Sequence, residues 1–152
     1  MVTLTELLAN LPPEPDEASL FVEIEQEVAR SKRKLVVIDD DPTGTQTVHD
    51  VELLTTWNTE MLAEVLQEER QLFYLLTNSR SMPESDAVRL NQETAQQLVA
   101  ASQATHSDFV IASRSDSTLR GHYPAHTSQL RPSLRPLLPE YCRAPRQLSG
   151  AA

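Results

Sequence analysis

Short apolar runs recur along the chain, and each is followed by a polar segment that favours a turn. These runs are rich in aliphatic and β-branched side chains, which suit buried strands. They predict four strands, at residues 34–38, 51–55, 71–76 and 108–112.

The segments between these runs have helical periodicity. Four helices are expected, at residues 3–11, 16–31, 59–69 and 84–104. In the second, Leu20, Ile24 and Val28 recur at helical spacing, and Asp16 and Asn58 stand at two helix starts as candidate N-caps. Strands that alternate with helices predict an α/β fold with a mainly parallel sheet flanked by helices.

The last 27 residues break this pattern, because four of the ten prolines fall there. Proline removes a backbone donor and clashes with the preceding helical turn, so no helix is expected after residue 125. The segment 126–152 is interpreted as an atypical Pro/Arg-rich tail. Two origins are open: a changed reading frame near His126, or a natural tail. The predicted organisation is a helical leader (1–33), an α/β domain (34–125) and this tail.

Three acids, Asp39, Asp40 and Asp41, end the first apolar run, and the turn Pro42-Thr43-Gly44 follows them. The carboxyl ends of strands are where open α/β sheets bind ligands. Each acid has two open roles, to accept backbone N–H groups of the turn or to contact a ligand. Gly44 is expected to permit a special backbone angle or a close approach.

Two further polar clusters follow apolar runs in the same way. One contains Asn78, Ser79 and Arg80, and the other is Ser113-Arg114-Ser115-Asp116-Ser117. A guanidinium group binds a carboxylate or phosphate through two parallel hydrogen bonds, so Arg114 is the first choice to bind an anionic group of a ligand. Asp and Ser side chains suit sugar hydroxyls.

The stretches DDDPTGTQT (39–47) and SRSDSTLRG (113–121) resemble the two signature motifs of the four-carbon acid sugar kinases, and TNSR (77–80) also fits. The resemblance runs from about Lys34 to Ala125. It implies an enzyme that phosphorylates tetronates, such as threonate or erythronate or their 3-oxo forms, with ATP and Mg²⁺. It implies further that this chain is the truncated N-terminal, sugar-acid-binding domain of a two-domain kinase. The nucleotide-binding half would then be missing, and the chain inactive as a kinase alone.

Within this resemblance, Asp40 and Asp116 are the catalytic candidates, because either one can orient the acceptor hydroxyl or take its proton. The substrate-binding candidates come from all three clusters: Asp39, Asp41, Thr43, Gly44, Asn78, Ser79, Arg80, Ser113, Arg114, Asp116 and Ser117. No metal site is expected, since the four histidines lack metal-ligand spacing.

Two alternatives stay open. Asp39 and Asp41 also fit the D-x-D-x-T motif of haloacid-dehalogenase-like phosphatases, with Asp39 as nucleophile and Asp41 as acid and base. That interpretation leaves residues 113–121 unexplained and lacks a downstream lysine, since none follows Lys34. The second alternative is a noncatalytic sugar-acid-binding domain.

Composition narrows the possible partners and location. A net charge of −9 disfavours nonspecific binding to nucleic acid. The sequence contains no run of 18 apolar residues, so no membrane span is expected. The N-terminus has no basic leader and Cys142 is the only cysteine, so a cytoplasmic protein without internal disulfides is expected. The three glycines form no phosphate loop. The expected partners are a small sugar acid and the nucleotide-binding half.

Overall fold

The computed structural model describes residues 3–4, 8–9, 11, 16–116 and 121–134. The chain divides into two compact units, Met1–Lys32 and Arg33–Ala152. The helix expected at residues 3–11 lies largely outside the described residues, as does the segment beyond residue 134.

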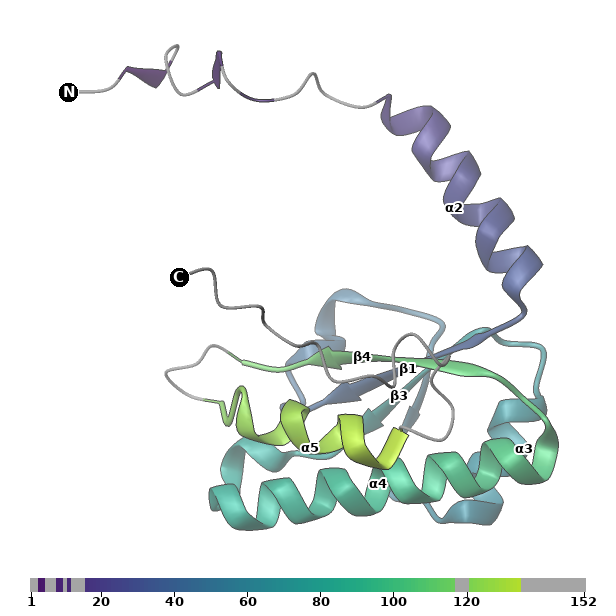
Figure 1. The fold of residues 1–152 in the computed structure, drawn as a ribbon, viewed down its shortest axis with the longest axis vertical. Coiled ribbons are helices and arrows are strands. Elements are labelled where there is room, and N and C mark those ends of the chain that lie inside the picture. Colours follow the sequence, from purple (N-terminus) through teal and green to yellow (C-terminus); the bar gives the residue numbers. More distant parts are fainter. Residues whose placement is uncertain (1–2, 5–7, 10, 12–15, 117–120, 135–152) are drawn as a thin grey trace, which may run out of the picture. The chain divides into compact units, whose positions relative to one another are not determined.

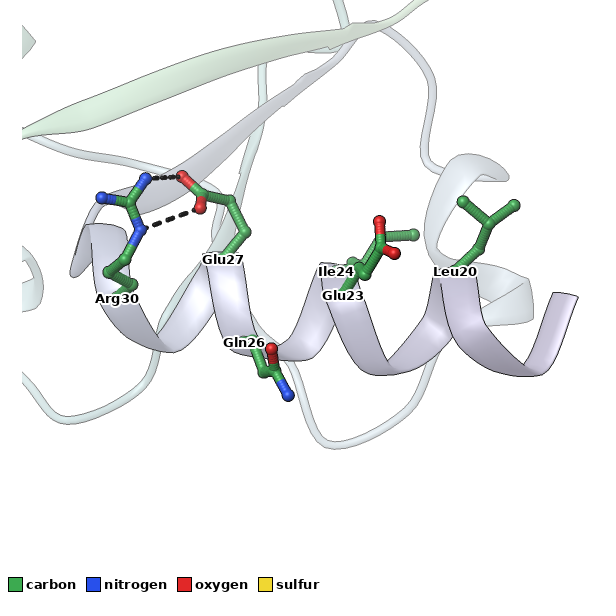
Figure 2. Close-up of a pocket in the computed structure, with 6 residues that line it drawn as sticks. All are labelled: Leu20, Glu23, Ile24, Gln26, Glu27 and Arg30. Atoms are coloured by element: carbon green, nitrogen blue, oxygen red, sulfur yellow. Dashed lines mark hydrogen bonds and ion pairs between the residues drawn. The ribbon is translucent and has the colours of Figure 1, made fainter. Parts of the chain in front are cut away.

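The first unit contains helix α2 (Glu17–Ser31), which confirms the second predicted helix. Asp16 is the N-cap residue, but its side chain makes no capping bond; instead, the Ser19 hydroxyl donates to the Asp16 carbonyl over 2.9 Å. Figure 2 shows Glu27 and Arg30 pointing toward one another, joined by hydrogen bonds of 3.0 and 2.8 Å beside a shallow hollow of this helix.

The second unit is built on a parallel sheet in the order β2-β3-β1-β4. This confirms the α/β fold and all four predicted strands, with each strand end within two residues of its predicted position. The strands are β1 (Lys34–Asp39), β2 (Glu52–Leu54), β3 (Leu72–Leu76) and β4 (Phe109–Arg114).

Three helices cover one face of this sheet in a single layer (Figure 1): α3 (Thr59–Gln67), α4 (Glu84–Thr105) and α5 (Ala125–Leu134). The core between the layers contains Val36 and Phe73 from the sheet and Leu62 and Leu98 from the helices. Asn58 caps α3 as predicted, since its side-chain oxygen accepts the Met61 backbone N–H over 2.8 Å. None of the helices within the described ranges is long and apolar enough to cross a membrane.

Helix α5 corrects the prediction that no helix follows residue 125. Pro132 lies within α5, where it removes the backbone donor to the carbonyl of residue 128. The buried side chain of Leu130 packs with Ile38 of β1 and Ala95 of α4. Burying a leucine contributes about 1.5–3 kcal/mol, which offsets much of the proline's cost of about 3 kcal/mol. The interpretation of a changed reading frame near His126 depends on a missing helix. The presence of α5 removes that support.

Candidate functional site

Three strands bring the predicted polar clusters to one edge of the sheet. Asp39, the last residue of β1, is in register with Leu76 of β3 and Arg114 of β4. The segments beyond these strands are also joined by their backbones. The Asp39 carbonyl accepts the Thr77 N–H over 2.8 Å, and the Asp40 carbonyl accepts the Arg80 N–H over 3.1 Å. We call the set Asp39, Asp40, Asp41, Arg80, Arg114 and Asp116 the charged edge.

The carboxylate of Asp39 is fully buried. Its Oδ1 accepts the Asp41 backbone N–H over 3.3 Å, whereas Oδ2 has no hydrogen-bond partner among the described residues. Burial raises the pKa of Asp39 above its ordinary value, although the Asp41 N–H and the positive charge of Arg114 act in the opposite direction. Burial of Asp39 therefore favours the neutral form of its carboxyl group more than water does.

Gly44 explains how this carboxylate is enclosed. A Cβ at residue 44 would lie only 2.0 Å from Asp39 Oδ2, far inside van der Waals contact. Gly44 does not have a positive φ, so of the two predicted reasons for glycine the close approach is the one found. The short 3₁₀ helix Gly44–Thr47 folds the loop back over the end of β1.

Asp41 is held by the turn that follows it. Its Oδ1 accepts the Thr43 backbone N–H over 2.9 Å and also the Thr43 hydroxyl, while its Oδ2 forms an ion pair with Arg80. The Thr43 hydroxyl and N–H, and then Arg80, lower the pKa of Asp41 below its ordinary value. Asp39 and Asp41 thus shift in opposite directions although they are two residues apart.

Arg80 bridges two acids of the charged edge. One nitrogen of its guanidinium group pairs with Asp41 and another with Asp116, and these contacts raise the pKa of Arg80. Asn78 adopts a left-handed backbone conformation with φ 50°, which turns the chain from β3 into the short 3₁₀ helix Ser79–Ser81 that carries Arg80. The half-buried guanidinium group is therefore committed to neighbouring carboxylates.

The two catalytic candidates are direct neighbours. Both carboxylate oxygens of Asp40 accept the Asp116 backbone N–H, over 3.2 and 3.1 Å. Asp40 is buried, whereas the side chain of Asp116 retains 13% of its accessible surface. Asp40 therefore fixes the backbone at Asp116, and the mostly buried carboxylate of Asp116 lies beside Arg80.

Arg114 ends the edge strand β4, and its side chain is exposed together with that of Ser113. Within the part of the chain that the structure describes, Arg114 forms no ion pair, while Arg80 pairs with two acids. The remaining candidates differ in position. Ser79 is buried and shares a hydrogen bond of 3.0 Å with Thr77, Asn78 is exposed, and Ser117 lies outside the described residues.

Sequence reasoning missed a pocket of about 330 Å³ at the same edge of the sheet. Its walls are residues 55–57 after β2, the end of β3, and one face of α4, with Leu76, Thr77, Leu90, Glu93, Thr94 and Gln97 as lining side chains. The four α4 residues follow the spacing i, i+3, i+4, i+7, which in sequence is equally typical of a helix face that packs on a core. Thr77 joins the pocket to the charged edge, because its hydroxyl donates to the Asp39 carbonyl over 2.9 Å.

In the described ranges, no three His, Cys, Asp or Glu side chains are placed to hold a metal ion together. Carboxylates that contact Arg80, Thr43 and backbone N–H groups instead form a hydrogen-bonded network with one exposed cation, Arg114, at its border.

Comparison with known proteins gives one informative match. No curated protein and no solved structure matches the chain. A family model described as a sugar-binding N-terminal domain matches residues 35–147, which includes the whole charged edge, the pocket and helix α5. The match spans well over half of the 152 residues, so the chain belongs to the family of sugar-binding N-terminal domains.

Proposed function

We propose that the chain binds the acceptor of an ATP-dependent kinase that phosphorylates four-carbon sugar acids. The observation that carries this proposal is the contrast between its two arginines at the charged edge. Arg80 is occupied by Asp41 and Asp116, whereas the exposed Arg114 has no ion-pair partner within the described segments. An exposed guanidinium group beside carboxylates suits a ligand that combines one carboxylate with several hydroxyls.

In this proposal Arg114 binds the carboxylate of the sugar acid through two parallel hydrogen bonds. Asp116 accepts a hydrogen bond from a substrate hydroxyl and so orients that hydroxyl, or takes its proton, during phosphoryl transfer. Asp40 is a positioning residue, because its carboxylate holds the backbone N–H of Asp116. Repulsion from these carboxylates limits binding of acids without hydroxyls.

ATP and Mg²⁺ belong to the nucleotide-binding half that the resemblance to four-carbon acid sugar kinases implies. Together they would supply the phosphoryl group and neutralise its charge. The guanidinium and carboxylate groups of the charged edge suit the acceptor, whose carboxylate and hydroxyls they can bind. The proposed work of this chain is to bind and orient the acceptor hydroxyl.

The phosphatase alternative requires Asp39 to reach a phosphorus atom as a nucleophile. Its carboxylate is fully buried and lies against Gly44, which disfavours that role. A noncatalytic sugar-acid-binding domain would share the binding step with the proposed kinase. Only turnover in the presence of a nucleotide-binding half separates these two functions.

Calorimetric titration with erythronate and with butyrate tests the proposal, because butyrate keeps the four carbons and the carboxylate but lacks the hydroxyls. Erythronate is expected to bind at least about tenfold more tightly, the effect of one hydrogen bond to a charged group. Equal binding of the two acids, or binding of neither, would contradict a sugar-acid site. A phosphatase assay with a generic phosphoester isolates the alternative activity.

A further inference from the structure

The pocket beside the charged edge has the size of a small-molecule site. Its volume of about 330 Å³ lies at the lower end of the range for ligand pockets, which is roughly 300–1,000 Å³. One wall is the loop 55–57, and another is the α4 face that includes Glu93 and Gln97. Because α4 and β3 form two of its walls, the pocket is shaped mostly by regular structure.

Trp57 gives the pocket an aromatic wall. Its side chain is half-buried and packs against the hydrophobic core that contains Leu62 and Phe73, so the core supports the indole ring from behind. A supported aromatic face with an exposed part suits the apolar C–H face of a sugar ring. Thr55, Thr56 and Gln97 add hydroxyl and amide groups that both donate and accept hydrogen bonds.

The charge of the pocket differs from that of the charged edge. Its described lining includes no lysine or arginine, and its one charged residue is Glu93. The nearest cation on α4, Arg89, pairs with Glu93 over 3.2 Å and with Asp86 over 3.4 Å. An anionic ligand would therefore meet a carboxylate without a cation of the lining to bind it, whereas sugar hydroxyls can donate to that carboxylate.

We propose that this pocket is a second ligand site, and that it binds an uncharged polyhydroxy compound such as a neutral sugar ring. We call it the neutral pocket. Its ligand stacks on Trp57 and donates hydroxyl hydrogens to Glu93 and Gln97. The site does not depend on the proposed kinase function, because neither Arg114 nor any other arginine of the charged edge lines it.

Intrinsic fluorescence tests this site directly, because Trp57 is the only tryptophan of the chain. The full chain is titrated with xylose, glucose, erythronate and adenosine, each to about 100 mM, which saturates a millimolar site. A neutral sugar is expected to give a saturable change in Trp57 emission. Gln97→Ala and Thr56→Ala, on different walls, should each weaken that sugar at least threefold, roughly the effect of one lost hydrogen bond.

Gln96→Ala is the matched control, since Gln96 is exposed on α4 and does not line the pocket. This variant and Arg114→Ala should bind the neutral sugar as the unaltered chain does. Circular dichroism confirms folding of each variant, and two independent pocket variants keep the test decisive if one fails to fold. Three results would overturn the proposal: no saturable change with either sugar, a response to adenosine alone, or a response to erythronate alone that Arg114→Ala abolishes.

Discussion

The charged edge and the neutral pocket occupy neighbouring parts of the same sheet edge, yet their chemistry differs. In the charged edge, carboxylates contact Arg80, hydroxyls and backbone N–H groups, and Arg114 is the exposed cation. In the neutral pocket, an indole ring and one face of α4 line the cavity together with hydroxyl and amide groups and a single carboxylate, that of Glu93. The comparison teaches that the partners of a polar residue, more than its identity, decide whether it is available to a ligand.

Arg80 shows this principle most clearly. It has the same functional group as Arg114, but two carboxylates already satisfy it. Its predicted role in substrate binding stays a prediction, and its contacts indicate that it also holds the charged edge together.

Arg80→Met should destabilise the fold more than any other change proposed for the charged edge. It leaves the carboxylates of Asp41 and Asp116 near one another without their shared cation. The loss should shrink below about pH 4, where carboxylates become protonated. Urea denaturation at several pH values measures it, with Arg89→Met as the control for an exposed arginine that also pairs with two acids. Equal midpoints for the two variants would show that the bridge by Arg80 contributes no special stability.

Gly44→Ala should lower the free energy of unfolding by about 1–3 kcal/mol, the usual cost of inserting a methyl group into a packed site. The added Cβ would overlap with Asp39 Oδ2. Urea denaturation of Gly44→Ala, of Asp39→Ala and of the double variant forms a thermodynamic cycle. The double variant should lose less stability than the two single variants lose in total. Strict additivity would mean that the two residues do not touch.

Asn58→Ala should lower the free energy of unfolding by about 1 kcal/mol, the typical value of a helix N-cap. Asn58 directly follows Trp57 and caps α3 through the Met61 N–H, so the change should loosen the loop that forms one wall of the neutral pocket. Thermal unfolding measures the loss, and erythronate binding should stay unchanged because the charged edge is intact. A variant that weakens erythronate instead would show that the two regions are coupled.

The smallest expected effect is a difference in pH dependence between Asp39 and Asp41. Because burial raises the pKa of Asp39, its contribution to stability is full below the unfolded pKa of 3.8 and is lost as pH rises through the folded pKa. For Asp41 the pKa is lowered, so its contribution is present above 3.8 and is lost as pH falls.

Unfolding midpoints from about pH 3 to pH 7 test these opposite signs. The stability of Asp39→Asn relative to the unaltered chain should rise with pH, and that of Asp41→Asn should fall. Parallel pH profiles for the two variants would refute the assignment of opposite environments to the two carboxylates.

Much of the fold could be predicted because it depends on local pattern. Strands β1, β3 and β4 follow from aliphatic runs, and Asn58 marks the start of α3. Helix α5 could not be predicted, because its stability depends on contacts of Leu130 with Ile38 and Ala95 that no local pattern shows.

The charged edge was predictable only in part, for a related reason. The strand ends indicated that Asp39, Arg80 and Arg114 would meet at one edge, and register confirms the position of the strands that carry them. Which arginine would be occupied depends on the distances between loops, and those are set by tertiary structure. Trp57 belongs to no motif, because the pocket that it lines is formed together with α4 residues that are distant in sequence.

The most direct test of the central claim, that Arg114 binds the carboxylate of a sugar acid, is calorimetric titration of erythronate into the unaltered chain and into Arg114→Ala. Arg89→Ala serves as the control for loss of an exposed arginine. Arg114→Ala should weaken binding by about 1.5–3 kcal/mol, the range for a hydrogen bond to a charged group, whereas Arg89→Ala should have no effect. Unchanged affinity in a folded Arg114→Ala variant would contradict the account.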